Sequence, residues 1–205
     1  ALDSAFYMSY GNVEPTGKRI MLALDVSGSM TSPVSGFPFI SCREVTGAMS
    51  LVTANVEKNY SIMGFTSGRN SFNIKSRNRW SSDGSIMELE ISPKQRLNDV
   101  THNMDHMPFS GTDCSLPMIY AMSKKILYDA FIVYTDNETW AGEIHASQAL
   151  KQYRNESGID AKLIVVGMTA TDFSIADPED RGMMDVVGFD TSVPNVISSF
   201  IKGDM

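Results

Sequence analysis

Residues 19–30 read RIMLALDVSGSM and decide the fold. Their first eight residues are almost continuously apolar, which is typical of a central parallel strand buried on both faces. The apolar run closes on the carboxylate of Asp25, and a stretch of serine and glycine follows it. The segment therefore predicts a buried strand with a polar loop at its carboxyl end.

Apolar runs alternate with amphipathic stretches along the rest of the chain. Strands are expected at 60–65, 86–91, 130–134, 162–166 and 186–189. Helices are expected at 43–58, 94–104, 115–126, 144–156 and 193–202. This βαβα alternation indicates an α/β fold, with a doubly wound, mainly parallel central sheet flanked by helices on both faces.

The length of 205 residues suits one domain over 1–205. We expect a lead-in segment at 1–18 and a long, partly basic connection at 66–93. No stretch has the roughly 20 unbroken apolar residues of a membrane span, so no membrane contact is expected. The formal net charge of −7 opposes nonspecific binding to nucleic acid, so any contact with RNA must be local.

Two aspartates close buried strands that lie far apart in the sequence. Asp25 follows the first strand and Asp136 follows the strand at 130–134, so a parallel sheet brings both to one edge. After Asp25, the hydroxyls of Ser27 and Ser29 can curl around the same centre if the chain turns at Gly28. Such hard oxygen donors select Mg²⁺, with Mn²⁺ and Ca²⁺ as alternatives, over zinc or copper.

These segments resemble the von Willebrand factor A (vWA) family and its metal-ion-dependent adhesion site (MIDAS). The resemblance rests on the Asp-x-Ser-x-Ser motif from Asp25, on Thr112 and on Asp136. It implies a Rossmann-like vWA fold in which Ser27 and Ser29 bind the metal directly. It also implies that the threonine and the aspartates bind the metal either directly or through water.

A longer resemblance connects the chain with the carboxy-terminal domain of the sixty-kilodalton Ro (SS-A) ribonucleoprotein autoantigens. It is carried by residues 1–7, 13–19, 111–119, 131–139 and 173–182. In that family a helical-repeat ring binds Y RNAs and misfolded noncoding RNAs, and the ring has no counterpart in these 205 residues. The resemblance implies a non-catalytic module that docks an acidic protein ligand at the metal within an RNA quality-control protein. We expect a cytoplasmic location, with the nucleus as an additional one.

Two further groups of residues are candidates for binding. Four basic side chains could contact RNA phosphates beside aromatic residues, or could form a solvated surface: Arg69, Lys75, Arg77 and Arg79. His102 and His106 lie four residues apart on an expected helix and could be half a metal site. A surface pair is the simpler interpretation, since no third soft ligand lies near them in the sequence.

Two other functions remain open. A Mg²⁺ ion between two aspartates could serve a hydrolase or a phosphoryl-transfer enzyme. The chain has neither a phosphate-binding glycine loop with lysine nor a G-x-S-x-G motif, so we do not expect an enzyme. A structural metal that braces the domain, with RNA contacts through 67–82, is the other alternative.

Overall fold

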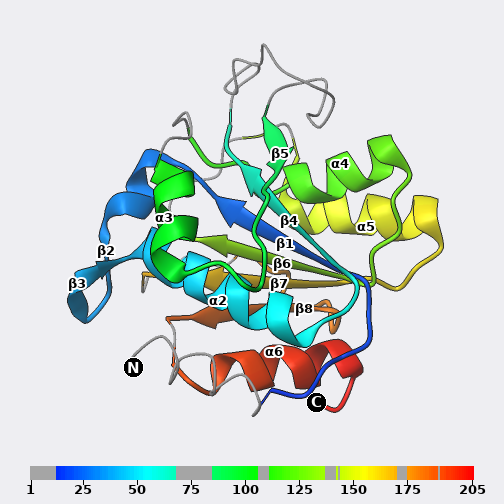
Figure 1. Ribbon diagram of the computed structural model, residues 1–205. Helices are drawn as coiled ribbons and strands as arrows, with labels where there is room; N and C mark the ends of the chain where they lie inside the picture. Colours follow the sequence, from blue (N-terminus) through cyan, green and yellow to red (C-terminus); the bar gives the residue numbers. More distant parts are fainter. Residues whose placement is uncertain are drawn as a thin grey trace.

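The structure is a computed structural model that describes residues 13–67, 85–105, 111–136, 142, 144–169, 175–188 and 190–205. Its centre is one six-stranded sheet with the order β5-β4-β1-β6-β7-β8 (Figure 1). The strands are β1 (Ile20–Asp25), β4 (Tyr60–Phe65), β5 (Ile86–Glu88), β6 (Ala130–Thr135), β7 (Lys162–Gly167) and β8 (Met183–Val187). Among the described strands of this sheet, β5 alone pairs antiparallel with its neighbour, which confirms a mainly parallel α/β sheet.

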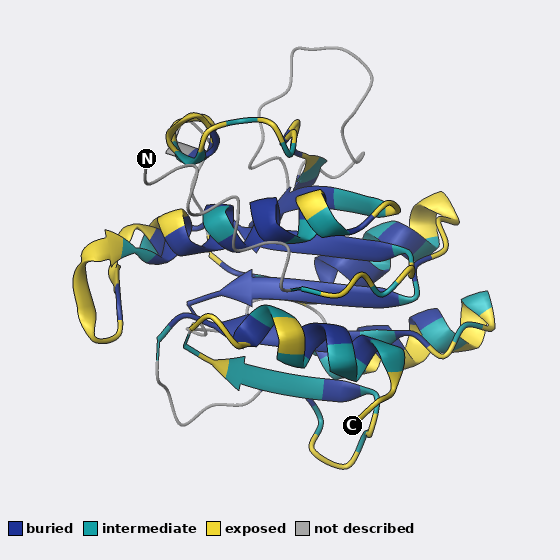
Figure 2. Ribbon diagram, turned by 60° about the horizontal axis from the view of Figure 1, so that its bottom comes forward, coloured by how far each residue is buried: buried dark blue, intermediate teal, exposed yellow. Residues whose placement is uncertain are grey.

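Helices cover both faces of this sheet (Figure 1). One face carries α2 (Cys42–Val56), α3 (Leu97–Asp105) and α6 (Val193–Lys202), and the other carries α4 (Leu116–Lys124) and α5 (Ala146–Ser157). Within β1, Leu22 and Leu24 point into the first layer, whereas Met21 and Ala23 point into the second. The strand is buried on both sides, as its continuous apolar run predicts (Figure 2).

The region after β1 differs from the sequence-based expectation of a plain loop. A short 3-10 helix, η2 (Gly28–Thr31), is followed by a hairpin of β2 (Pro33–Val34) and β3 (Phe37–Ser41). The two strands are short and contain prolines, so they lack the alternation that marks longer strands. Phe37 is 50% exposed and Phe39 is 95% exposed.

Some predicted boundaries are wrong. The last strand was expected at 186–189, but β8 spans Met183–Val187, where Asp185 interrupts the apolar pattern. The expected helix at 94–104 begins three residues later, at Leu97, after a turn in which Gln95 N donates to Ser92 O. Both errors arise where polar residues blur the hydrophobic period.

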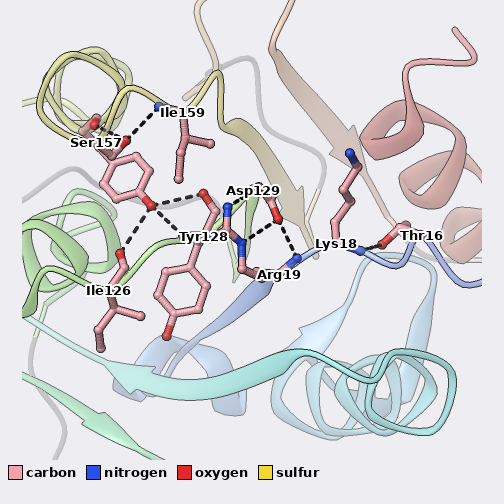
Figure 3. Close-up of polar contacts among 9 residues, drawn as sticks. Thr16, Lys18, Arg19, Ile126, Tyr128, Asp129, Ser157 and Ile159 are labelled. Atoms are coloured by element: carbon pink, nitrogen blue, oxygen red, sulfur yellow. Dashed lines mark hydrogen bonds and ion pairs between the residues drawn. The ribbon is translucent and has the colours of Figure 1, made fainter.

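The amino edge of the sheet, where β1 and β6 begin, is closed by polar contacts within the protein (Figure 3). Arg19 Nη2 lies 2.6 Å from Asp129 Oδ1, and Arg19 Nε lies 2.9 Å from Asp129 Oδ2. The hydroxyl of Tyr153 accepts a hydrogen bond from Tyr128 N at 2.6 Å and donates to Tyr128 O at 3.1 Å. These contacts fix the start of β6 beside the start of β1.

No described helix is long and apolar enough to cross a membrane. Cys42 and Cys114 are both buried and carry free thiols. The candidate RNA contacts at residues 69–79 and the imidazole of His106 lie outside the described residues. His102 is exposed near the end of α3, as a surface histidine would be.

Candidate metal-binding site

Asp25 is the centre of the polar cluster at the carboxyl edge of the sheet. It is the last residue of β1 and is fully buried. Its Oδ1 accepts a hydrogen bond from Ser27 N at 2.8 Å. Its Oδ2 accepts from Thr112 Oγ1 and from Thr135 Oγ1, each at 2.9 Å. All of these donors are neutral.

The two serines of the Asp-x-Ser-x-Ser motif lie together at the start of η2, where Ser27 is the N-cap residue and Ser29 is the second residue of the helix. The oxygens Ser27 Oγ and Ser29 Oγ are 3.0 Å apart. The chain turns at Gly28 as expected, by entering a 3-10 helix that begins there. Met30 N donates to Ser27 O, which closes this turn and keeps both hydroxyls beside the end of β1.

Thr112 reaches the same place from the loop that precedes α4. Gly111 O accepts hydrogen bonds from Ser67 N at 2.5 Å and from Thr66 Oγ1 at 2.9 Å. The loop is therefore tied to the end of β4, the strand next to β1. This tether explains how a residue 87 positions after Asp25 comes to donate a hydrogen bond to its carboxylate.

Asp136 directly follows β6 and is 2% exposed. In the register of β1 and β6, Leu24 pairs with Tyr134, so the ends of the two strands lie side by side. The carbonyl of Asp136 accepts a hydrogen bond from Thr169 Oγ1 in the segment after β7. The structure thus brings the three predicted segments to one edge of the sheet.

Burial raises the pKa of Asp25 to about 6, although hydrogen bonds from Ser27, Thr135 and Thr112 act in the opposite direction. Three neutral donors only partly replace the water that a carboxylate loses on burial. A divalent cation would favour the charged form of Asp25 much more strongly. The carboxylate is therefore held in surroundings that suit a bound cation.

The thiols of Cys42 and Cys114 are not suited to bind the metal. Burial, with the charges of Asp136 and Asp25, raises the pKa of Cys42 to about 11. Burial likewise raises the pKa of Cys114 well above that of an ordinary thiol. Neutral thiols are poor ligands, so carboxylate and hydroxyl oxygens remain as the donors, and these fit Mg²⁺, Mn²⁺ or Ca²⁺.

Sequence reasoning missed two residues of this region. Thr135 donates to Asp25 Oδ2, and its position as the last residue of β6, level with Asp25 in the sheet, was the available signal. Arg43 is 2% exposed, and its Nη2 lies 3.3 Å from Ser27 O. The sequence gives no comparable signal for Arg43, because a second-position arginine on a helix is usually exposed.

Known proteins share sequence with this domain. A family model described as the Ro60 vWA domain matches residues 19–201. The chain is 44% identical to the RNA-binding protein RO60 of Caenorhabditis elegans and 43% identical to that of Deinococcus radiodurans. These matches cover 99% and 100% of this chain, but 29% and 36% of the relatives, so the chain spans about a third of their length.

The solved structures agree on the fold. The Deinococcus radiodurans Ro protein superposes with a TM-score of 0.84 at 42% identity, covering 100% of this chain and 38% of that one. Proximal thread matrix protein 1 from the mussel byssus, in a structure with a zinc-occupied MIDAS motif, superposes with a TM-score of 0.53. That match has 10% identity and covers 93% of this chain and 48% of that one, so it shows the fold alone. By the family model and the relatives, this chain belongs to the Ro60 vWA domain family.

Proposed function

We propose that this chain is a non-catalytic, divalent-metal-dependent ligand-binding module. One Mg²⁺ ion would be held by five residues of the carboxyl edge: Asp25, Ser27, Ser29, Thr112 and Asp136. The observation that carries the proposal is the buried carboxylate of Asp25, whose described donors are all neutral. Burying a carboxylate without a countercharge is costly, and a bound cation would remove that cost.

The ligand that fits such a site is an acidic side chain of another protein. Two aspartates balance the charge of a divalent ion, and the remaining donors are neutral hydroxyls. With five protein ligands, octahedral Mg²⁺ has one position left for an outside oxygen, and a carboxylate is a hard anionic donor. The metal would therefore bridge the domain and a glutamate or aspartate of its partner.

The wider role of this module is proposed from its relatives. Two of them are named RNA-binding proteins, and most of their length lies outside this chain. We therefore assign RNA binding mainly to a helical-repeat ring in the rest of the protein. The module would act in a cytoplasmic Ro-type protein that handles Y RNA and misfolded noncoding RNA.

A binding experiment tests the proposal. A fluorescent pentaglutamate peptide should bind the chain at least about tenfold more tightly in Mg²⁺ than in EDTA. A pentaglutamine peptide is the matched control and should show no such difference. Equal affinity of pentaglutamate in Mg²⁺ and EDTA would contradict the proposal.

An activity assay separates the enzyme alternative. The described side-chain donors to Asp25 are hydroxyls, and neither histidine nor lysine is among them. The purified chain should therefore not hydrolyse p-nitrophenyl phosphate or ATP in Mg²⁺ or Mn²⁺. Turnover that disappears on Asp25→Ala would instead establish a metal-dependent hydrolase.

A further inference from the structure

Large apolar side chains are exposed on the β2–β3 hairpin, next to the proposed metal site. Phe39 is 95% exposed, Phe37 is 50% exposed and Ile40 is 38% exposed, all of them on β3. Val34 on β2 is buried and anchors the hairpin to the domain. Apolar side chains scattered singly over a surface need no explanation, whereas three on one short strand indicate a binding surface.

The hairpin begins beside the serine hydroxyls of the metal site. Ser32 N donates to Ser29 O at 2.8 Å, and Cys42 N donates to Ser32 O at 2.9 Å. Pro33 pairs with Ser41, so both strands of the hairpin leave from this closed base. In Figure 1 the hairpin projects from the side of the sheet toward which β1 points. The metal site and the exposed phenylalanines therefore share one end of the molecule.

A short peptide can reach from the metal site to the exposed rings. Phe37 and Phe39 are two residues apart, so their side chains lie on the same face of β3. Phe39 lies roughly 7 Å along the strand from Ser41, and one turn of 3-10 helix separates Ser29 from Ser32 by roughly 6 Å. With a hairpin width of roughly 5 Å, the path from Ser29 to Phe39 is at most about 20 Å. An extended peptide covers that path in about six residues.

The segment between Asp25 and Arg43 offers no charge of its own. Residues 26–42 contain no aspartate, glutamate, lysine or arginine. A ligand with carboxylates throughout would place some of them against apolar rings, where they lose hydration. Nucleic acid fits no better, since the hairpin offers no cation to its phosphates. The surface fits a ligand with an acidic residue at the metal and an apolar residue over the hairpin.

We propose that the β2–β3 hairpin is the apolar half of the ligand-binding surface, and that the ligand is a protein segment with an acidic residue and an aromatic or large aliphatic residue within about six positions of it. This inference rests on the proposed function and names the class of partner. The acidic residue binds the metal, and the apolar residue packs against Phe37 and Phe39.

Peptide binding to the 205-residue chain in Mg²⁺ tests the inference. The first probe is a fluorescent glycine–serine heptapeptide with glutamate at its second position and phenylalanine at its sixth. A second probe has serine in place of the phenylalanine, and a third has glutamine in place of the glutamate. For wild type we expect the first probe to bind about five- to tenfold more tightly than the second, because a phenylalanine ring is buried. Its binding should weaken in EDTA, and the third probe should bind weakly in both conditions.

Two substitutions of exposed residues locate the apolar contact. Phe39→Ser should bind the first two probes with affinities within about twofold of each other, because the packing partner is lost. Leu127→Ser is the matched control, since Leu127 is 46% exposed but lies before β6 at the amino edge of the sheet. That variant should keep the full preference for the first probe. In both variants Mn²⁺ affinity, measured by electron paramagnetic resonance, should stay within about twofold of wild type, because neither side chain is a proposed ligand.

Several outcomes would overturn the inference. One is equal, metal-dependent binding of the first two probes to wild type, which would leave the proposed metal site intact. Another is a Phe39→Ser variant, folded by circular dichroism, that keeps the wild-type preference. A wild-type dimer that Phe39→Ser converts to a monomer in sedimentation experiments would assign the hairpin to a second copy of the chain instead. If the first probe binds equally in Mg²⁺ and EDTA, the proposed function itself fails.

Discussion

The two edges of the central sheet both carry an aspartate beside the end of β1 or β6, but they balance its charge in different ways. At the amino edge, Asp129 is paired with Arg19, whose hydrogen bond holds the pKa of that carboxyl below its usual range. At the carboxyl edge, the described donors to Asp25 are neutral, and burial raises the pKa of its carboxyl to about 6. At the amino edge, the charge of Asp129 is balanced by Arg19 of the same chain. At the carboxyl edge, the carboxylate of Asp25 suits a bound cation from outside the protein.

Removing the carboxylate of Asp25 should lower the affinity for metal, whereas removing that of Asp129 should lower stability. Asp25→Ala should weaken Mn²⁺ binding by more than about a thousandfold, or about 4 kcal/mol, because an anionic ligand is lost. Asp129→Ala should leave Mn²⁺ affinity within about twofold. It should lower the free energy of unfolding by about 1 kcal/mol, since the pair with Arg19 is partly exposed. Mn²⁺ titration and urea unfolding measure the two effects, and a metal affinity equally sensitive to both substitutions would contradict the contrast.

The pH dependence of metal-free stability should also distinguish the edges. The folded-state pKa of Asp25 is raised from 3.8 to about 6, so its contribution to stability falls as pH rises through that window. From about pH 4 to pH 7 this amounts to roughly 2.5 kcal/mol of unfolding free energy. Asp129 has a lowered pKa, so its contribution is present above 3.8 and is lost as pH falls through its folded pKa.

Urea unfolding in EDTA at several pH values provides the measurement. Relative to wild type, Asp25→Asn should flatten the stability profile between about pH 4 and pH 7, because the buried group no longer ionises. Asp129→Asn is the control and should change the profile only at lower pH. A wild-type profile that Asp25→Asn leaves unaltered would show that Asp25 ionises without cost.

The tyrosine contact at the amino edge should matter for stability alone. Tyr153→Phe removes the hydroxyl that accepts from Tyr128 N at 2.6 Å and leaves that buried donor without its acceptor. We expect a loss of about 2 kcal/mol in the free energy of unfolding. The edge-on packing of the ring against Phe131, with centroids 4.9 Å apart, should persist. Mn²⁺ affinity should stay within about twofold, and a larger loss would mean that the edges are coupled.

The hydroxyl of Thr135 at the carboxyl edge should matter for metal affinity. Thr135→Val removes one donor to Asp25 Oδ2 with little change in shape. We expect about tenfold weaker Mn²⁺ binding, because groups that orient a metal ligand typically contribute this much. Thr101→Val removes a hydroxyl that donates to Leu97 O inside α3 and serves as the control. Equal Mn²⁺ affinity of the two variants would exclude a role for Thr135 in orienting Asp25.

The sequence predicts the parts of the fold whose residues are buried on both sides. The continuous apolar runs of β1, β6 and β7 mark the strands and, through their ends, the convergence of Asp25 and Asp136. The β2–β3 hairpin was missed and β8 was misplaced, because short or half-exposed strands carry a weaker hydrophobic pattern.

The residues of the candidate site also divide into those that local sequence predicts and those that depend on the fold. The Asp-x-Ser-x-Ser motif, Thr112 and Asp136 could be predicted because each adjoins a recognisable element. Thr135 was missed although it ends the strand before Asp136, because its hydrogen bond to Asp25 depends on the register of β1 and β6, which the sequence does not specify. Arg43 could not be predicted either, because its burial results from the packing of α2 against the loop of Ser27 rather than from local sequence.

The most direct test of the central claim is the anomalous diffraction of Mn²⁺ in crystals of this chain grown with acetate. We predict one strong peak at the carboxyl edge, within about 2.0–2.3 Å of the hydroxyl oxygens of Ser27 and Ser29. An acetate oxygen should occupy another position around the ion. A crystal saturated with Mn²⁺ that shows no peak near these serines and Asp25 would contradict the account.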